Sequence, residues 1–220
     1  MKHILCYGDS NTWGQDPTTL NPATGSGLRH PDHVRWPNVM GSKLGADYKI
    51  HEAGLCGRTT VYDDPIAYGR NGLWHFEVAY NSCMPVDCVI VMLGTNDTKD
   101  MFASSPTIIA YGIERLVFHC QDVIRRSLSP DAKLVLACPV VTGADRNGTY
   151  WFGFTEEATR KGEALREIYR NTAARMGCAF FDVNDVACAD PGDGVHLSAE
   201  SHRSIGEALA DVVRSVLESE

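Results

Sequence analysis

The chain has 220 residues, of which 44% are hydrophobic and 22% are charged, and its formal net charge is −8 at pH 7. This length suits a single α/β domain over residues 1–220 with a sizeable buried core. The acidic balance disfavours nucleic acid or an anionic membrane as a partner, because both require a basic face. No run reaches the roughly 18 apolar residues of a membrane span, and no signal-peptide pattern opens the chain, so we expect a cytoplasmic protein.

The cysteines and histidines do not form a metal-site pattern. None of the eight cysteines belongs to a C-x-x-C pair, and none of the eight histidines has the spacing of zinc ligands. Several cysteines lie in apolar, strand-like runs, where a thiol packs as a small hydrophobic side chain. We therefore expect free thiols in a reducing compartment and no metal. His202 lies six residues after His196 and is expected to be solvated.

The first part of the chain begins with a predicted strand over 2–7, which is a short apolar run. A long loop rich in Pro, Thr, Gly and Asn follows over 15–34. Pro37 suits the first turn of a helix and Gly45 suits its end, so a helix is predicted between them.

The middle of the chain contains the strongest predicted strand. A weaker strand over 47–52 leads into a turn-rich loop, and a helix is predicted over 73–82. The run from Val86 to Leu93 is almost continuously apolar, as a central parallel strand is. A long helix is predicted over 107–128, where apolar residues recur at helical spacing.

The last part of the chain repeats this alternation of strand and helix. A strand over 133–138 is followed by an aromatic-rich loop over 139–155 and a helix over 155–176. A final strand over 178–182 precedes a helix over 198–217. Five strands separated by helices predict a flavodoxin-like, doubly wound α/β fold, in which helices cover both faces of a parallel sheet.

Polar or glycine-rich turns follow three of the predicted strands. They are Gly8-Asp9-Ser10, Cys56-Gly57-Arg58 and Gly94-Thr95-Asn96-Asp97. Because the carboxyl ends of parallel strands meet at one edge of the sheet, these turns should lie together. A serine on such a turn is a candidate nucleophile if a base, a group that orients the base and donors for an oxyanion lie nearby.

The loop before the last helix supplies a candidate base and a carboxylate to orient it. Asp193 precedes His196 by three residues, with a glycine between them, so its carboxylate can curl back to the imidazole. It would then fix the ring tautomer while the other nitrogen accepts the proton of Ser10. Asp190 is the competing carboxylate, and its six-residue separation and an intervening proline disfavour it.

Three groups could donate hydrogen bonds to an oxyanion at this site. They are the backbone N–H of Ser10, the backbone N–H of Gly57, which no side chain obstructs, and the side-chain amide of Asn96. The loss of one such donor typically costs about 2.7–4 kcal/mol of transition-state stabilisation. Taken alone, Asn96 is also typical of a turn and Gly57 of an unusual backbone conformation.

Together these residues resemble the SGNH hydrolases, also called GDSL esterases. The motifs Gly8-Asp9-Ser10, Gly57, Gly94-Thr95-Asn96-Asp97 and Asp193-x-x-His196 occur in the order typical of that family and cover nearly the whole chain. The resemblance implies that Ser10 is the nucleophile, that Asp193 and His196 complete a triad, and that Ser10, Gly57 and Asn96 form the oxyanion hole. It also implies a three-layer α/β/α sandwich with a five-stranded parallel sheet, and a reaction without a cofactor.

Longer stretches are similar to the bacterial arylesterase/acyltransferase branch of this family. They cover residues 4–14, 34–36, 54–60, 63–65 and 92–99. The resemblance implies a small-molecule ester substrate with an acetyl to butyryl group, acyl transfer to alcohols in some members, and a homo-oligomer. The acyltransferase members carry Ala in place of Gly57, and they have an insertion after Leu128 that this chain lacks.

Aromatic side chains near the predicted site could form a substrate pocket. Trp13, Trp151 and Phe152 are the candidates, and a bulky Trp151 would favour small acyl groups by exclusion. Phe154 is expected to pack in the core instead. Arg58 could meet a substrate carboxylate, although a structural ion pair is the favoured interpretation.

Two other functions remain as alternatives. One is a carbohydrate O-acetylesterase that acts inside the cell on acetylated sugars by the same chemistry. The other is a non-catalytic, flavodoxin-like domain whose serine turn binds a phosphate. Only Gly8 and Gly14 flank Ser10, whereas a phosphate loop is glycine-rich and opens a helix, so this second alternative is disfavoured.

Overall fold

The computed structural model describes residues 1–21 and 24–218, so residues 22–23 of the predicted 15–34 loop lie outside the described ranges. Its centre is a five-stranded sheet in the order β2-β1-β3-β4-β5, and all four strand pairs are parallel. The strands are β1 (Lys2–Gly8), β2 (Tyr48–Gly54), β3 (Cys88–Met92), β4 (Lys133–Cys138) and β5 (Ala179–Asp182). The predicted doubly wound α/β fold is confirmed.

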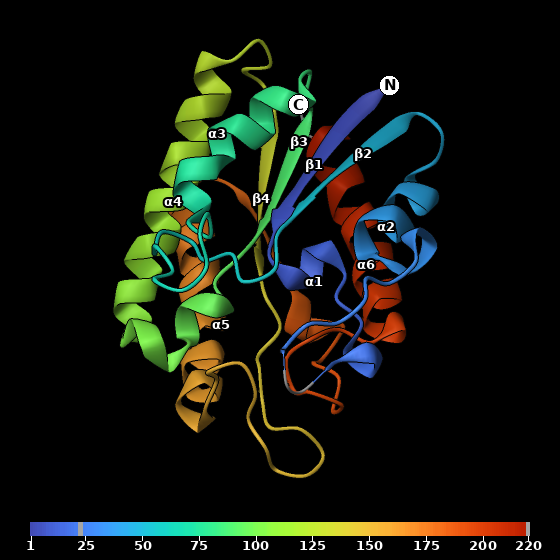
Figure 1. Cartoon of the computed structure of the whole chain (residues 1–220). Helices are drawn as coiled ribbons and strands as arrows, with labels where there is room; N and C mark the ends of the chain where they lie inside the picture. The colour runs from blue at the N-terminus through green and yellow to red at the C-terminus, as the bar shows by residue number, and fades with distance from the viewer. Residues whose placement is uncertain (22–23, 219–220) are drawn as a thin grey trace.

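Helices form a layer on each face of the sheet (Figure 1). They are α1 (Ser10–Trp13), α2 (Trp36–Leu44), α3 (Gly72–Cys83), α4 (Pro106–Arg126), α5 (Glu156–Met176) and α6 (Ala199–Glu218). Helices α3, α4 and α5 cover one face, and α2 and α6 cover the other. The five longer helices begin and end close to the predicted positions, while the four-residue α1 was not predicted.

The side chains of the central strands alternate between the two helical layers. In β1, Leu5 and Tyr7 pack toward α3, α4 and α5, whereas Ile4 and Cys6 pack toward α2 and α6. All four are fully buried. Each large apolar side chain buried in this way contributes about 1.5–3 kcal/mol. Burial on both faces is why the strands read as continuous apolar runs rather than as alternating patterns.

Two glycines let α1 pack directly on the ends of the strands. Gly8 and Gly54 are partners in the β1–β2 register. A Cβ atom on Gly54 would lie 2.1 Å from the backbone nitrogen of Trp13, and one on Gly8 would lie 2.0 Å from Oγ1 of Thr12. The absence of both Cβ atoms therefore brings α1, which begins at Ser10, against the carboxyl edge of the sheet.

The loop that precedes α2 is fixed by a buried arginine. Arg35 is 4% exposed, and its guanidinium donates to both carboxylate oxygens of Glu52 at 2.7 Å. It also donates to the backbone oxygen of His30 at 2.8 Å. Because Glu52 belongs to β2, this bidentate pair holds the loop beside the strand ends.

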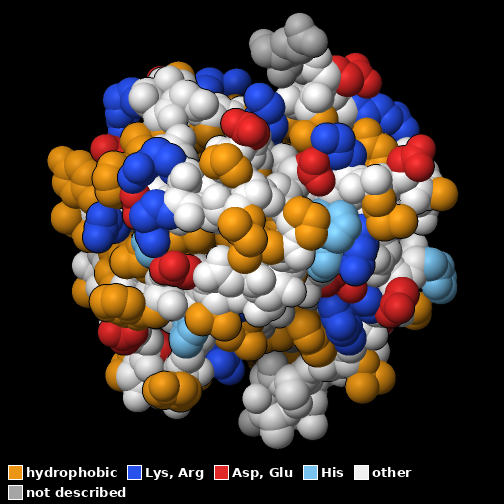
Figure 2. All heavy atoms as spheres, turned by 90° about the horizontal axis from the view of Figure 1, so that it is seen from above, with side chains coloured by type: hydrophobic (Ala, Val, Ile, Leu, Met, Phe, Trp, Pro, Cys, Tyr) orange, Lys and Arg blue, Asp and Glu red, His pale blue; other side chains and the backbone are white. Residues whose placement is uncertain are grey.

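The surface at the amino ends of the strands carries both signs of charge. Figure 2 shows this face with Lys and Arg side chains interspersed among Asp and Glu and with scattered hydrophobic side chains. Mixed charges of this kind do not form the continuous basic footprint of a nucleic-acid site. Within the described ranges, no helix combines the length and the apolar character that a bilayer crossing demands.

Substitution of Gly54 by Ala should destabilise the protein. The added methyl group would overlap the backbone of α1, and relief of such overpacking typically costs about 1–3 kcal/mol. Urea denaturation should show this loss as a lower midpoint with an unchanged slope. Gly143→Ala is the matched control, because no atom lies within 4 Å of a Cβ atom there. An unchanged midpoint for Gly54→Ala would show that α1 does not press on β2.

Candidate active site

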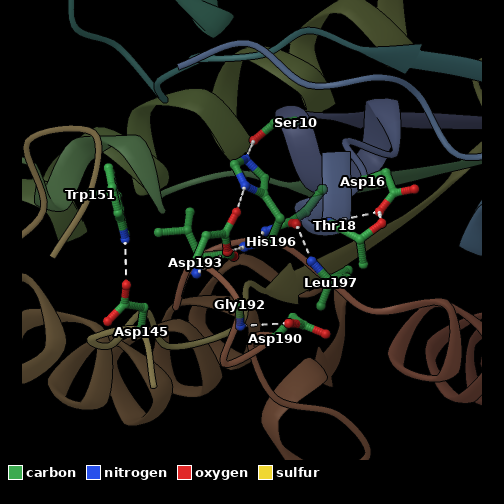
Figure 3. Close-up of polar contacts among 12 residues, drawn as sticks. Ser10, Asp16, Thr18, Asp145, Trp151, Asp190, Gly192, Asp193, His196 and Leu197 are labelled. Carbon is green, nitrogen blue, oxygen red and sulfur yellow. Dashed lines mark hydrogen bonds and ion pairs between the residues drawn. The ribbon is translucent and has the colours of Figure 1, made fainter. Parts of the chain in front are cut away.

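Three side chains from opposite ends of the chain meet at the carboxyl edge of the sheet (Figure 3). Ser10 follows β1, while Asp193 and His196 lie in the loop between β5 and α6. Nε2 of His196 lies 3.0 Å from Oγ of Ser10, and Nδ1 lies 2.6 Å from Oδ2 of Asp193. The exposed fractions of Ser10, His196 and Asp193 are only 7%, 4% and 0%. The structure thus places the three predicted residues in one hydrogen-bonded series.

The carboxylate of Asp193 is held in its charged form. Its Oδ1 atom accepts the backbone N–H groups of Val195 and His196, both at 2.9 Å. Burial alone would raise its pKa, but these bonds and the imidazole contact hold the pKa of Asp193 below the ordinary value. A charged carboxylate favours the proton on Nδ1, which leaves Nε2 to accept the hydroxyl proton of Ser10. Asp190 instead accepts the Gly192 N–H at 2.6 Å and shapes the turn.

Asp9 fixes the turn that presents Ser10. Its Oδ1 atom accepts the N–H of Asn11 at 2.9 Å and so caps α1. Gly14 ends this short helix with a φ of 89° and donates its N–H to the Ser10 carbonyl at 2.8 Å. Ser10 therefore occupies the first position of a single helical turn that is held at both ends.

The side chain of Asn11 joins the two halves of the site. Its Nδ2 donates to the Val195 carbonyl at 3.2 Å, and its Oδ1 accepts the N–H of Leu197 at 3.1 Å. These bonds hold the backbone on both sides of His196. They come from Asn11, which is adjacent to Ser10. The sequence offered no local signal for this role, because the partners lie 184 and 186 positions away.

The predicted oxyanion donors line the same cavity as Ser10 and His196. This cavity has a volume of about 440 Å³, and Gly57 and Asn96 contribute to its wall. Asn96 is 5% exposed and donates one amide hydrogen to the Arg58 carbonyl at 3.0 Å, which leaves its second amide hydrogen for another acceptor. Gly57 has a φ of 80°, in the left-handed region that favours glycine.

Hydrogen bonds to a buried carboxylate connect the Gly57 loop to the Asn96 turn. Asp97 is fully buried, and its two oxygens lie 3.0 and 3.1 Å from the backbone nitrogen of Thr60. The Thr60 hydroxyl also donates to Oδ1. Burial raises the pKa of Asp97 to about 6, although the bonds from Thr60 act in the opposite direction. These hydrogen bonds between Thr60 and Asp97 fix the positions of two predicted oxyanion donors, Gly57 and Asn96, relative to each other.

Phenylalanine side chains, and not tryptophans, form the aromatic wall of this cavity. Phe152 lines it and lies 5.6 Å from the His196 ring, centroid to centroid, in an edge-on arrangement. Phe154 also lines the cavity. It packs in the core against Ala158 and Val195, as predicted.

The structure does not place Trp13 or Trp151 on the wall of this cavity. The indole N–H of Trp151 donates to Oδ2 of Asp145 at 3.0 Å, which holds the ring away from Ser10 (Figure 3). The Trp13 ring lies under the guanidinium of Arg29 at 5.5 Å. The proposed exclusion of large acyl groups by Trp151 therefore has no geometric support.

The predictions of an ion pair for Arg58 and of a solvated side chain for His202 are wrong. Within the described ranges Arg58 forms no ion pair; its guanidinium lies 4.2 Å from the Tyr7 ring centroid and donates to the Gly8 carbonyl at 2.8 Å. His202 is fully buried rather than solvated, because its Nδ1 accepts the N–H of Trp36 at 3.2 Å. Burial lowers the pKa of His202 to about 3.

Sequence reasoning missed several polar residues of the cavity. Gln15, Asp64, Arg70 and Lys99 line it. Asp64 and Lys99 lie in stretches similar to the arylesterase/acyltransferase branch, but no role in the cavity was predicted for them, and Gln15 and Arg70 lie in no such stretch. Across residues 1–21 and 24–218, no group of three or more His, Cys, Asp or Glu side chains is placed to hold a metal ion.

A serine hydroxyl, an imidazole and a carboxylate in series, beside N–H donors in a cavity, constitute the arrangement of serine-dependent acyl-transfer enzymes. The sequence pattern of the GDSL-like lipase/acylhydrolase family matches residues 6–204. The chain belongs to this family and is a carboxylic ester hydrolase. The non-catalytic phosphate-binding alternative is therefore wrong.

Solved structures of similar proteins agree with this assignment. The M. smegmatis aryl esterase has 35% identity, a TM-score of 0.89, and coverage of 98% of this chain and 99% of its own. A carbohydrate acetylesterase from Sinorhizobium meliloti has 36% identity, a TM-score of 0.90, and coverage of 98% and 100%. A carbohydrate acetylesterase family member from the same organism has 37% identity, a TM-score of 0.86, and coverage of 99% of both chains. No curated protein sequence gives a significant match.

Asp97 should make stability depend on pH. Its folded pKa of about 6 lies above the value of about 3.9 in an unfolded chain. The folded state therefore binds the proton more tightly, so this contribution is fully present below about pH 4 and is lost as the pH rises through 6. The unfolding free energy of the wild type relative to Asp97→Asn should fall by about 2 kcal/mol between pH 4.5 and 7.5.

Urea denaturation of both proteins at the two pH values measures this difference. Asp131→Asn, at an exposed position, is the control for loss of a carboxylate. A difference between wild type and Asp97→Asn that is the same at pH 4.5 and 7.5 would refute the assigned cause.

Proposed function

We propose that this enzyme hydrolyses short-chain carboxylic esters, acetyl to butyryl, through an acyl-enzyme on Ser10. The observation that carries the proposal is the 3.0 Å contact between Oγ of Ser10 and Nε2 of His196, at the wall of a cavity that also holds Gly57 and Asn96. A hydroxyl is a weak nucleophile alone, and a neutral imidazole at this distance can take its proton during attack.

The proposed reaction has two steps. Oγ of Ser10 attacks the ester carbonyl while Nε2 of His196 takes its proton, and Asp193 stabilises the imidazolium. The oxyanion accepts hydrogen bonds from the Ser10 and Gly57 N–H groups and the Asn96 amide. The ester C–O bond then breaks, and the alcohol leaves with the proton from Nε2. Water then attacks the acyl carbon while Nε2 of His196 takes its proton. The bond between the acyl carbon and Oγ breaks, the carboxylic acid leaves, and the proton returns from Nε2 to Oγ of Ser10.

An alcohol could replace water in the second step, and we propose that such transfer is the minor path. In the acyltransferase relatives Ala stands at the position of Gly57. Here a Cβ atom would be strained at a φ of 80° and would lie 3.3 Å from Nε of Arg70. The backbone and Arg70 therefore favour glycine at this position. Because this chain lacks the alanine of the acyltransferases, we expect hydrolysis to dominate over transfer.

Acetylated sugars are a second candidate substrate class. The cavity wall includes polar side chains such as Gln15, Thr24 and Asp64, which could bind sugar hydroxyl groups. The similarity to a carbohydrate acetylesterase from Sinorhizobium meliloti also favours this class. Aryl acetates and acetylated sugars share the same acyl group, so both fit the proposed reaction.

Replacement of the nucleophile tests the proposal. Ser10→Ala should lower kcat/KM for p-nitrophenyl acetate by at least about 10³-fold, because the acyl-enzyme cannot form. A serine-directed organophosphonate should label the wild type at Ser10, as mass spectrometry of peptides would show. Ser82→Ala, on the exposed side of α3, should leave both readouts unchanged. Near-full activity of Ser10→Ala would show that another residue is the nucleophile.

A series of p-nitrophenyl esters tests the acyl length. The phenyl rings of Phe152, beside His196, and of Phe154, on the same cavity wall, are expected to limit the acyl group, so kcat/KM should fall steeply beyond butyryl. Phe152→Ala should relax this limit and raise the rate for hexanoyl esters relative to acetyl. Efficient hydrolysis of octanoyl esters by the wild type would contradict a small acyl site.

We also propose that the enzyme is a cytoplasmic homo-oligomer. All eight cysteines are free thiols, which is typical of a reducing compartment. Large apolar side chains are exposed on the packed pair α3 and α4, including Trp74 and Val78 at 67% and Tyr111 at 64%. Native mass spectrometry should find more than one subunit, and Trp74→Glu should lower that number. A monomeric wild type would contradict the proposed assembly.

A further inference from the structure

Two cations line the cavity that holds Ser10. Arg70 comes from the loop before α3, and Lys99 follows the Asn96 turn. Both are half-buried. Within the described ranges neither has a carboxylate close enough for an ion pair. Among the described residues, Asp64 is the one carboxylate on this wall, and its Oδ1 atom already accepts the N–H groups of Ile66 and Ala67 at 2.8 and 2.9 Å.

Arg70 lies directly beside the proposed oxyanion site. Its Nε would be 3.3 Å from a Cβ atom on Gly57, so the guanidinium packs against that residue. One of its terminal nitrogens, Nη1, donates to the Tyr68 carbonyl at 2.8 Å, which leaves other N–H groups of the fork for a ligand.

Lys99 has lost much of its contact with water. Its Nζ lies 5.2 Å from the centroid of the Phe154 ring, which also lines the cavity. Burial lowers the pKa of the ammonium group, against the attraction of Asp64. A partly desolvated ammonium without a bonded carboxylate gains more from an anionic ligand than an exposed one does.

A third donor on the same wall has no partner. Gln15 is 6% exposed and lines the cavity, and its Nε2 has no hydrogen-bond partner among the described residues. Buried amide groups are almost always hydrogen-bonded, so this donor indicates a ligand that carries an acceptor.

We propose that Arg70, Lys99 and Gln15 form a subsite for a carboxylate on the alcohol part of the ester. The inference rests on the proposed esterase function. Because the acyl group is proposed to be short, an anion that reaches this subsite belongs to the leaving alcohol. A planar carboxylate can accept hydrogen bonds from a guanidinium and an ammonium at once. The preferred substrates are therefore acyl esters of hydroxy acids, such as acetoxybenzoates.

Paired substrates test this subsite. The probes are 3- and 4-acetoxybenzoate and their neutral methyl esters, with kcat/KM measured for each. Lys99→Met and Arg70→Met should each lower kcat/KM for the carboxylates about tenfold, the loss expected for one charge-assisted hydrogen bond. The neutral esters should change by less than about threefold. Lys99→Arg should keep most of the preference, because it keeps the charge.

Lys133→Met is the matched control, because it removes the same charge from an exposed position at the start of β4. It should leave all four rates unchanged. Equal losses on charged and neutral esters in Lys99→Met and Arg70→Met would assign these residues a structural role and overturn the subsite.

A second pair separates the two parts of the ester. Mono-p-nitrophenyl succinate carries the anion on the acyl part, and p-nitrophenyl acetate is its neutral partner. A preference that depends on Lys99 only in this pair would overturn the assignment to the alcohol. Failure of the wild type on every ester would refute the proposed function itself, whereas an active wild type without any carboxylate preference would refute the subsite alone.

Discussion

The geometry of the site depends on the two hydrogen bonds of the Asn11 side chain. Local contacts fix each half separately, since Asp9 caps the helix of Ser10 and the Asp193 carboxylate bonds the backbone of its own loop. The Asn11 side chain spans the halves through the carbonyl of Val195 and the N–H of Leu197, beside the direct contact between Ser10 and His196. His196 lies between these two anchors. The two buried hydrogen bonds hold the backbone on either side of His196, and such groups are costly to leave unpaired.

The parallel sheet makes this arrangement possible, because every loop that carries a group proposed to react or to donate to the oxyanion leaves a strand at the same edge. The cost lies in the buried carboxylates. Burial raises the pKa values of Asp9 and Asp97. The folded protein would therefore be more stable if both carboxyl groups were neutral. Their oxygens nevertheless hold the turn of Ser10 and the loop of Gly57. Stability is thus given up where it fixes donor positions, as is usual at functional sites.

The sequence was sufficient for the strands and for the spacing of Ser10, Asp193 and His196, because burial on two faces and a three-residue separation both leave local patterns. It was insufficient for side chains whose direction depends on a distant partner. Trp151 turns toward Asp145, and His202 turns inward because the N–H of Trp36 needs an acceptor. Neither partner can be found from local periodicity. Lys99 and Arg70 were missed for the same reason, since irregular loops carry no pattern that tells which way they face.

A buried charge is costly unless it has a partner, and the charges around the cavity differ in this respect. The carboxylates beneath the cavity accept backbone N–H groups: Asp9 from Asn11, Asp97 from Thr60 and Asp193 from Val195. Their negative charge is therefore engaged by backbone N–H groups that hold the loops in place. Oδ2 of Asp9 has no hydrogen-bond partner among the described residues. Within the described ranges, Arg70 and Lys99 on the wall have no carboxylate at ion-pair distance, and Arg70 donates only to the Tyr68 carbonyl. A chain with a net charge of −8 can thus present a locally cationic cavity, and the selectivity of the enzyme follows from these local groups rather than from its total charge.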